Sequence, residues 1–213
     1  MHLGIRETTL DWGPARRFQR VMASSLRPFL RGRAETAGRD DEAYRSYGLR
    51  AASGTTNLAI YRSLVRAYPD RDRRQMLLDL IESRGDKGKW FAAAKDAGFL
   101  DVAIECAATY GIDPSMLVRA ARDFSDTEPQ FAASIALMAI GHLLRGGGYD
   151  PRPSDATDAI GYLFAAAQRI GATGWASQEL AHLVQTPCAP GRQPFQDAIR
   201  VALSRRGQSG PGN

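Results

Sequence analysis

The chain contains little cysteine and little histidine. Of its 213 residues, two are cysteine and three are histidine. Cys106 and Cys188 are too few for a disulfide framework, and His2, His142 and His182 show no metal-ligand spacing with them or with one another. We therefore expect two structural thiols in a reducing compartment, no metal site and no cofactor.

Long hydrophobic runs are also missing. The longest apolar stretch, residues 131–144, is interrupted by Ser134, Gly141 and His142, and it falls short of the ~20 residues that span a bilayer. The N-terminus lacks the apolar segment of a secretory signal. We expect a buried helix at 131–144 that holds His142 as a core or inter-helix residue, no membrane span, and a cytoplasmic protein.

Alternating apolar and polar residues, the pattern of strands, do not occur in the sequence. Alanine-rich stretches with apolar residues at i, i+3, i+4 and i+7 recur instead, separated by Gly, Pro or Asp. The pattern predicts an all-α fold without a sheet. The expected helices span residues 14–31, 40–51, 55–67, 71–83, 87–97, 99–110, 113–124, 129–145, 154–170, 174–186 and 193–206.

Local signals at the ends of these helices predict where several of them begin and stop. Side chains of Asp, Ser and Thr cap helix N-termini, proline favours the first helical position, and glycine favours the C-terminal end. The expected N-terminal caps are Thr55 or Thr56, Asp70, Asp86 and Asp113 followed by Pro114, and the expected glycine stops are Gly85, Gly98, Gly111 and Gly171.

Short connections between helices predict antiparallel helical hairpins stacked into an α-solenoid of the TPR/HEAT-like kind. A weak echo, "FAAAKDAG" from Phe91, "FAASIALM" from Phe131 and "FAAAQRIG" from Phe164, supports stacking, although alanine-rich composition alone also produces such echoes. We expect an Arg-rich N-terminal helical segment at 1–54, a helical-repeat domain at 55–206 and a flexible tail at 207–213.

No nucleotide-binding loop is present. "SRGDKGKWFAAAKDAG", residues 83–98, contains Gly88-Lys89, but Ser83 stands where the phosphate loop needs its first glycine and Trp90 stands where it needs a hydroxyl. The stretch is better interpreted as a joint between two helices, with Trp90 facing inward and the lysines in water.

Nucleophilic catalysis finds no support either. There is no G-x-S-x-G elbow, and Cys106 has no neighbouring base. Asp155 and Asp158 form a carboxylate pair, but they fall near a helix start, where capping explains them. A hydrolase would need a site assembled from residues distant in sequence.

Positive charge is concentrated near the N-terminus, in a chain of formal net charge +5. Between Trp12 and Ala34 there are six arginines and no acidic residue: Arg16, Arg17, Arg20, Arg27, Arg31 and Arg33. On a helix, four of them share a face opposite an apolar stripe. The helix would contact an acidic protein surface, phosphates or a membrane face, or it docks through its apolar stripe and leaves the arginines in water.

Residues 58–206 contain the stretch "LIESRGDKGKWFAAAKDAG" and the less specific stretches "DPSMLVRAARDF", "EPQFAASIALMAIGHLLRGGGYD" and "GRQPFQDAIRVAL". Through these stretches the chain resembles the C-terminal part of a family of uncharacterised bacterial α-helical-repeat proteins. The resemblance implies an α-solenoid and no established activity, so it assigns no role to any residue.

Together these patterns predict a non-catalytic module that binds a protein partner, as an adaptor or as an inhibitor that occupies the partner's surface. The expected contacts are the six arginines and the aromatic residues Trp12, Tyr149 and Trp175, each of which belongs to the core in the alternative interpretation. A nucleic-acid-binding protein that uses the basic helix is the alternative function. We also expect self-association through an exposed end of the array.

Overall fold

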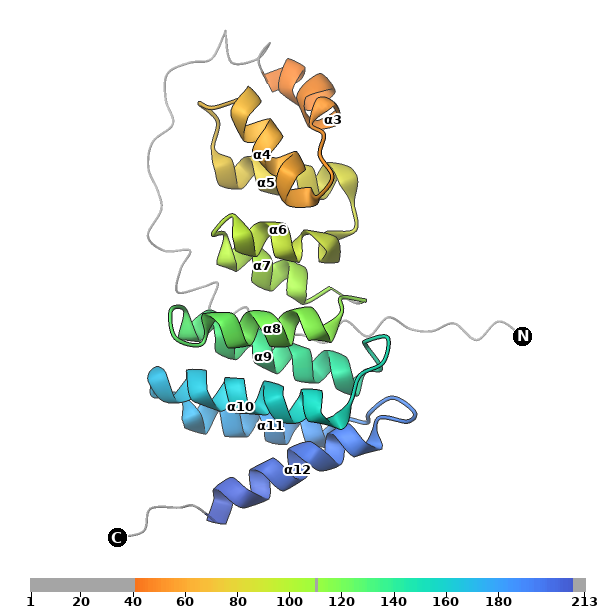
Figure 1. The fold of residues 1–213 in the computed structure, drawn as a ribbon, viewed down its shortest axis with the longest axis vertical. Helices are drawn as coiled ribbons and strands as arrows, with labels where there is room; N and C mark the ends of the chain where they lie inside the picture. The colour runs from red at the N-terminus through yellow and green to blue at the C-terminus, as the bar shows by residue number, and fades with distance from the viewer. Residues whose placement is uncertain (1–40, 110, 209–213) are drawn as a thin grey trace, which may run out of the picture. The chain divides into compact units, whose positions relative to one another are not determined.

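The computed structural model describes residues 41–109 and 111–208 and shows an all-helical protein (Figure 1). No strand occurs in this part of the chain, as the sequence predicts. Contacts divide the chain into residues 1–40 and residues 41–213, so residues 41–54 group with the helices that follow them. The predicted helix at 14–31 lies outside the described residues.

The helices follow one another with short connections. In chain order they are the π-helix η1 (Tyr44–Gly48), α3 (Leu49–Ala51), α4 (Asn57–Ala67), α5 (Arg73–Arg84), the 3₁₀ turn η2 (Lys87–Trp90), α6 (Phe91–Asp96), α7 (Leu100–Ala107), α8 (Pro114–Phe124), α9 (Pro129–Leu144), α10 (Pro153–Arg169), α11 (Thr173–Gln185) and α12 (Gln193–Gln208). Contacts join α4 with α5, α6 with α7, α8 with α9 and α10 with α11.

Helix α9 forms the centre of the core. Every residue from Phe131 to Leu144 except Ser134 is buried, and α7, α8, α10, α11 and α12 all contact the helix. Buried alanines on α8, α9 and α10 let the backbones of these helices approach closely, because a methyl group occupies less space between two helices than a larger side chain does. The expectation of a buried helix here is confirmed.

The predicted helix ends are largely confirmed. The Thr56 hydroxyl accepts a hydrogen bond from Ala59 N at 3.1 Å, and Asp113 accepts one from Ser115 N at 3.0 Å, immediately before Pro114. The four predicted glycine stops all have positive φ. Glycine adopts this backbone conformation without the penalty that a Cβ brings.

Two predicted caps are wrong. Asp70 does not cap α5, because the helix begins at Arg73 and the Asp72 carboxylate accepts a hydrogen bond from Gln75 N at 2.6 Å. Asp86 stands at the N-cap position of η2, but its side chain makes no cap hydrogen bond: its backbone is left-handed, with φ of 51°, and its carboxylate instead pairs with Lys89 at 2.5 Å. The 3₁₀ turn then leads into α6, where a continuous helix was expected over 87–97.

The echoed phenylalanines are buried but not equivalent. Phe91 is the first residue of α6, Phe131 is the third of α9 and Phe164 is the twelfth of α10. They therefore stand at different points of their helices, and α6 opens a hairpin whereas α9 closes one. The spacing of these segments does not correspond to a structural repeat unit.

No helix in the described part of the chain is both long enough and apolar enough to cross a membrane.

Candidate binding site

The predicted contact residues are only partly described by the structure. Trp12 and the six arginines of the basic segment, Arg16, Arg17, Arg20, Arg27, Arg31 and Arg33, lie outside the described residues. Tyr149 is fully exposed, at 105% of its reference area, in the loop between α9 and α10. Trp175 is half-buried in the first turn of α11. Neither aromatic residue lines the groove between α8 and α10 or the groove between α4, α5 and the loop that joins α6 to α7.

The Tyr149 loop is held against the start of α12. The Arg192 guanidinium donates hydrogen bonds to Gly146 O at 3.1 Å and Gly147 O at 3.3 Å, and Ala189 N donates to Leu144 O at 2.8 Å. These hydrogen bonds fix the base of the loop, and Tyr149 extends into solvent from it.

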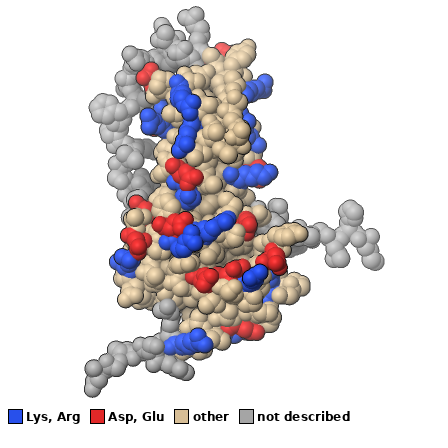
Figure 2. Space-filling view, in the orientation of Figure 1, with Lys and Arg blue, Asp and Glu red and all other residues tan. Residues whose placement is uncertain are grey.

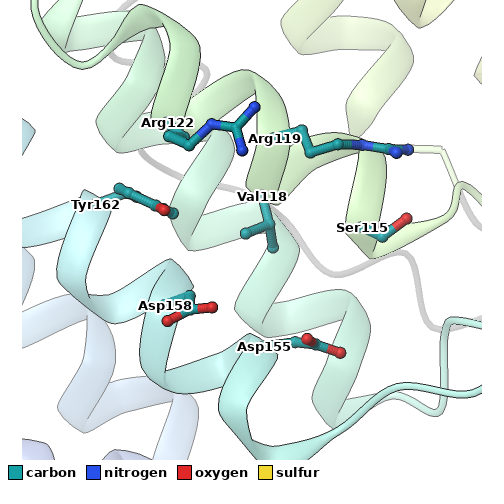
Figure 3. A pocket seen from close by; sticks show the side chains of 7 residues that line it. All are labelled: Ser115, Val118, Arg119, Arg122, Asp155, Asp158 and Tyr162. Carbon is teal, nitrogen blue, oxygen red and sulfur yellow. The ribbon is translucent and has the colours of Figure 1, made fainter.

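A groove of about 220 Å³ runs between α8 and α10, and we call it the α8–α10 groove (Figure 3). Seven side chains line it: Ser115, Val118, Arg119 and Arg122 from α8, and Asp155, Asp158 and Tyr162 from α10.

The local sequence explains why these side chains share the groove. Asp113 and Pro114 fix the start of α8, so residues 115, 118, 119 and 122 fall at i, i+3, i+4 and i+7 on one face. Pro153 opens α10, where residues 155, 158 and 162 are likewise spaced by three and four. Contact between α8 and α10 brings the two faces together.

The two edges of the α8–α10 groove carry opposite charge. In Figure 3 the arginines lie along the α8 side, and the two aspartates lie along the α10 side with Tyr162 near one end. Arg122 pairs with its neighbour Asp123 at 2.9 Å, and the Asp155 carboxylate accepts a hydrogen bond from Arg152 N at 2.8 Å.

The side chains of Arg119 and Asp158 have no ion pair or hydrogen bond with any other described residue. They therefore offer a positive group on one edge of the groove and a negative group on the other. Capping explains Asp155, as expected from the sequence, but not Asp158, which is the sixth residue of α10 and faces the groove.

A second groove lies between α4, α5 and the loop that joins α6 to α7. Its volume is about 360 Å³. Its lining combines arginine with aromatic and aliphatic side chains: Tyr61, Arg62, Val65, Arg66, Arg73, Ala97 and Phe99. We call it the α4–α5 groove.

Histidine and cysteine do not contribute to either groove. His142 is 2% exposed and its Nε2 lies 2.8 Å from Ala107 O, whereas His182 is exposed on α11. Burial lowers the pKa of His142 to about 4 and raises that of the Cys106 thiol to about 11. At neutral pH a neutral imidazole and a protonated thiol are therefore present, and within the described residues no group of His, Cys, Asp and Glu has the arrangement of a metal site.

Sequence reasoning noted Asp155 and Asp158 only as a carboxylate pair near a helix start, and it missed the other groove residues because each is an ordinary residue of a helix face. The only signal is the spacing of three and four within each helix, which shows a shared face but not which helix lies opposite.

Comparison with known protein families, curated proteins and solved structures gives no match for this chain.

Proposed function

We propose that this protein is a non-catalytic helical-repeat module that binds a protein partner, as an adaptor or as an inhibitor that occupies the partner's surface. The α8–α10 groove is the observation that carries this proposal. Opposite charges face each other there without an ion pair between them, so a ligand that brings both charges finds a complement on each edge. A polypeptide segment that contains acidic and basic side chains has this property.

The charge of the described residues favours protein over nucleic acid. Residues 41–208 contain 20 Lys and Arg and 19 Asp and Glu, so this part of the chain is nearly neutral. Figure 2 shows both signs interleaved over α8 and α10. A polyanion would meet Asp155 and Asp158 along one edge of the groove, where repulsion opposes the attraction of the arginines.

The remaining parts of the proposal follow from the sequence. We propose an α-solenoid of stacked hairpins in a cytoplasmic protein, which the free thiols of Cys106 and Cys188 support. Membership of the helical-repeat family that residues 58–206 resemble belongs to the same proposal. Self-association through an array end stays a prediction, to which the structure adds no support: among the described residues of α12, the exposed side chains are polar apart from Pro194 and Val201.

A polarity reversal tests the proposal. The double variant Arg119→Asp, Asp158→Arg exchanges the two unpaired charges across the α8–α10 groove and leaves the net charge of the chain unchanged. We expect affinity capture from the native cell to recover a protein partner with wild type and to lose at least about 90% of it with this variant. A tenfold loss in affinity corresponds to about 1.4 kcal/mol, and two charges placed opposite like charges of the partner are enough to cause a loss of this size.

The matched control exchanges two residues outside the groove. Arg200→Asp with Asp197→Arg reverses an exposed ion pair on α12 and also conserves net charge. Partner recovery at the wild-type level with both double variants would overturn the proposal, and so would recovery of nucleic acid alone. Circular dichroism confirms that both variants fold.

A further inference from the structure

The α4–α5 groove carries arginines that have no counter-charge. Arg62, Arg66 and Arg73 are all exposed, and the side chain of none of them has an ion pair, hydrogen bond or ring contact with another described residue. Other arginines nearby are engaged. Arg71 pairs with Asp41, Arg74 with Asp101, and Arg84 donates to the carbonyls of Leu49 and Ala52.

Free positive charge at this groove is unfavourable without a ligand. Arg62 and Arg66 are one turn apart on α4, a spacing at which like charges repel each other. Asp72, next to Arg73 in the chain, is already engaged as the N-cap of α5. Most of the charged side chains that Figure 2 shows over α4 and α5 are Lys and Arg. An anionic ligand would relieve this repulsion.

The floor between the arginines is apolar. Tyr61 is 6% exposed and packs edge-on against Phe99, with ring centroids 6.2 Å apart. Val65 and Phe99 are half-buried beside it, and Ala97 completes the wall. A volume of about 360 Å³ lies within the range of pockets that accept small ligands or single side chains. The groove therefore pairs an apolar floor with a cationic rim.

We propose that the α4–α5 groove binds a polypeptide segment in which carboxylate side chains flank an aliphatic or aromatic residue. The apolar residue lies on Tyr61, Val65 and Phe99, and the carboxylates pair with Arg62, Arg66 and Arg73. Arginine suits this role because its guanidinium binds a carboxylate through two parallel hydrogen bonds. The inference rests on the proposed function in taking a protein as the partner, but it concerns a different surface.

Single-stranded nucleic acid fits this groove less well. Such ligands need exposed aromatic faces on which bases stack, whereas Tyr61 is buried and Phe99 is edge-on to it. Three arginines also span too little surface to follow a phosphate backbone, and the rest of the described chain is nearly neutral.

The test uses the full chain and a random 12-residue peptide library displayed on phage. We expect wild type to select peptides in which Asp or Glu flanks Leu, Phe, Tyr or Trp. The variant Arg62→Glu, Arg66→Glu is expected to lose this selection. The control variant Arg45→Glu, Arg50→Glu reverses two exposed arginines near α3 and is expected to keep it.

Fluorescence anisotropy then measures one selected peptide. We expect the Arg62→Glu, Arg66→Glu variant to weaken binding at least about tenfold, the control to change it less than about twofold, and 0.5 M NaCl to weaken it for wild type because salt screens the pairs. Selection of the same peptides by all three proteins overturns the inference. So does a failure of wild type to enrich acidic peptides, or Arg62-dependent binding of an oligothymidine strand in their place.

The two proposals fail separately. The polarity reversal at Arg119 and Asp158 leaves the α4–α5 groove intact, so it is expected to keep the peptide selection even if it loses the cellular partner. Loss of peptide selection in that variant would contradict the assignment of acidic peptides to the α4–α5 groove.

Discussion

At the scale of single residues, His142 shows how a buried polar side chain is satisfied in an apolar helix. Its Nε2 lies 2.8 Å from Ala107 O, and its Nδ1 lies 3.3 Å from the Arg145 guanidinium. A neutral ring with its proton on Nε2 fits both contacts, because Nε2 then donates to the carbonyl and Nδ1 accepts from the guanidinium. A second proton on Nδ1 would face a positive charge in a buried site.

This environment predicts a pH dependence of stability. Burial lowers the pKa of His142 from 6.5 to about 4 in the folded state, so between these values the unfolded chain binds the proton that the folded chain excludes. The contribution of His142 is therefore complete above pH 6.5 and is lost as the pH falls through 4. We expect the free energy of unfolding to fall by up to about 3 kcal/mol over this interval.

Urea unfolding at pH 7, 5.5 and 4 measures the effect. His142→Gln removes the titrating group, so its free energy of unfolding is expected to fall less between pH 7 and pH 4 than that of wild type, whatever the stability of the variant at pH 7. His182→Gln removes an exposed histidine and is expected to leave the fall unchanged. An equally steep fall in wild type and in His142→Gln would show that other groups cause it.

At the scale of elements, the start of α5 distinguishes two neighbouring aspartates. Asp72 accepts a hydrogen bond from Gln75 N, whereas Asp70 makes no hydrogen bond with another described residue. We expect Asp72→Ala to lower the free energy of unfolding by about 1 kcal/mol, the usual value of an N-cap, and to lower Tm by about 2–4 °C in a chain of this size. Asp70→Ala is expected to change the free energy by less than about 0.5 kcal/mol. Thermal unfolding followed by circular dichroism checks both, and equal losses would contradict the assignment of the cap.

The same two aspartates show what the sequence predicts well and where it stops. Helix positions were predicted to within two residues for α4, α5 and α8 to α11, because proline, glycine and capping side chains act on their own turn. Helix α6 begins four residues after the predicted start, and α7 ends three residues before the predicted end. Which of two aspartates caps a helix depends on the φ and ψ of a single residue: Asp72 is extended, with φ of −60° and ψ of 118°. Composition and spacing do not determine that conformation.

The candidate grooves were not predicted, for a related reason. Residues 115–122 and 155–162 show the spacing of a helix face, but a groove exists only because α8 and α10 contact each other across about 40 residues of chain. Such pairings depend on how α9 packs between its neighbouring helices, and short-range sequence patterns do not predict that packing. The exposure of Tyr149 likewise depends on a long-range contact, the hydrogen bonds of Arg192 to its loop.

At the scale of residues 41–208 as a whole, contacts join elements that are near in chain order, such as α3 with α5, α4 with α6 and α8 with α10. One cluster of side chains helps to hold residues 41–51, beside the hydrogen bond of Arg84 to Leu49 O. The Tyr44 hydroxyl donates a hydrogen bond to the Asp79 carboxylate at 2.9 Å. The Tyr44 ring packs edge-on against Tyr68 with ring centroids 5.2 Å apart, and the Arg71 guanidinium lies 4.1 Å from the centroid of the Tyr44 ring. Where each helix contacts mainly the helices next to it, weakening this cluster is expected to destabilise residues 41–51 and to leave α9 unaffected.

Hydrogen exchange followed by mass spectrometry tests this expectation. Tyr44→Phe removes the hydrogen bond from a buried side chain to the half-buried carboxylate of Asp79, a loss of at most about 1.5–3 kcal/mol. We expect faster exchange of the amides of residues 41–51 and unchanged exchange in α9. The matched variant Tyr47→Phe removes a hydroxyl from a side chain on the same helix that is 74% exposed, and it is expected to change neither. The proposed solenoid would transmit such a loss only weakly, because stability in a solenoid is a sum of local and nearest-neighbour terms. An equal rise over residues 41–51 and over α9 in Tyr44→Phe would instead mean that the helices unfold as one cooperative unit.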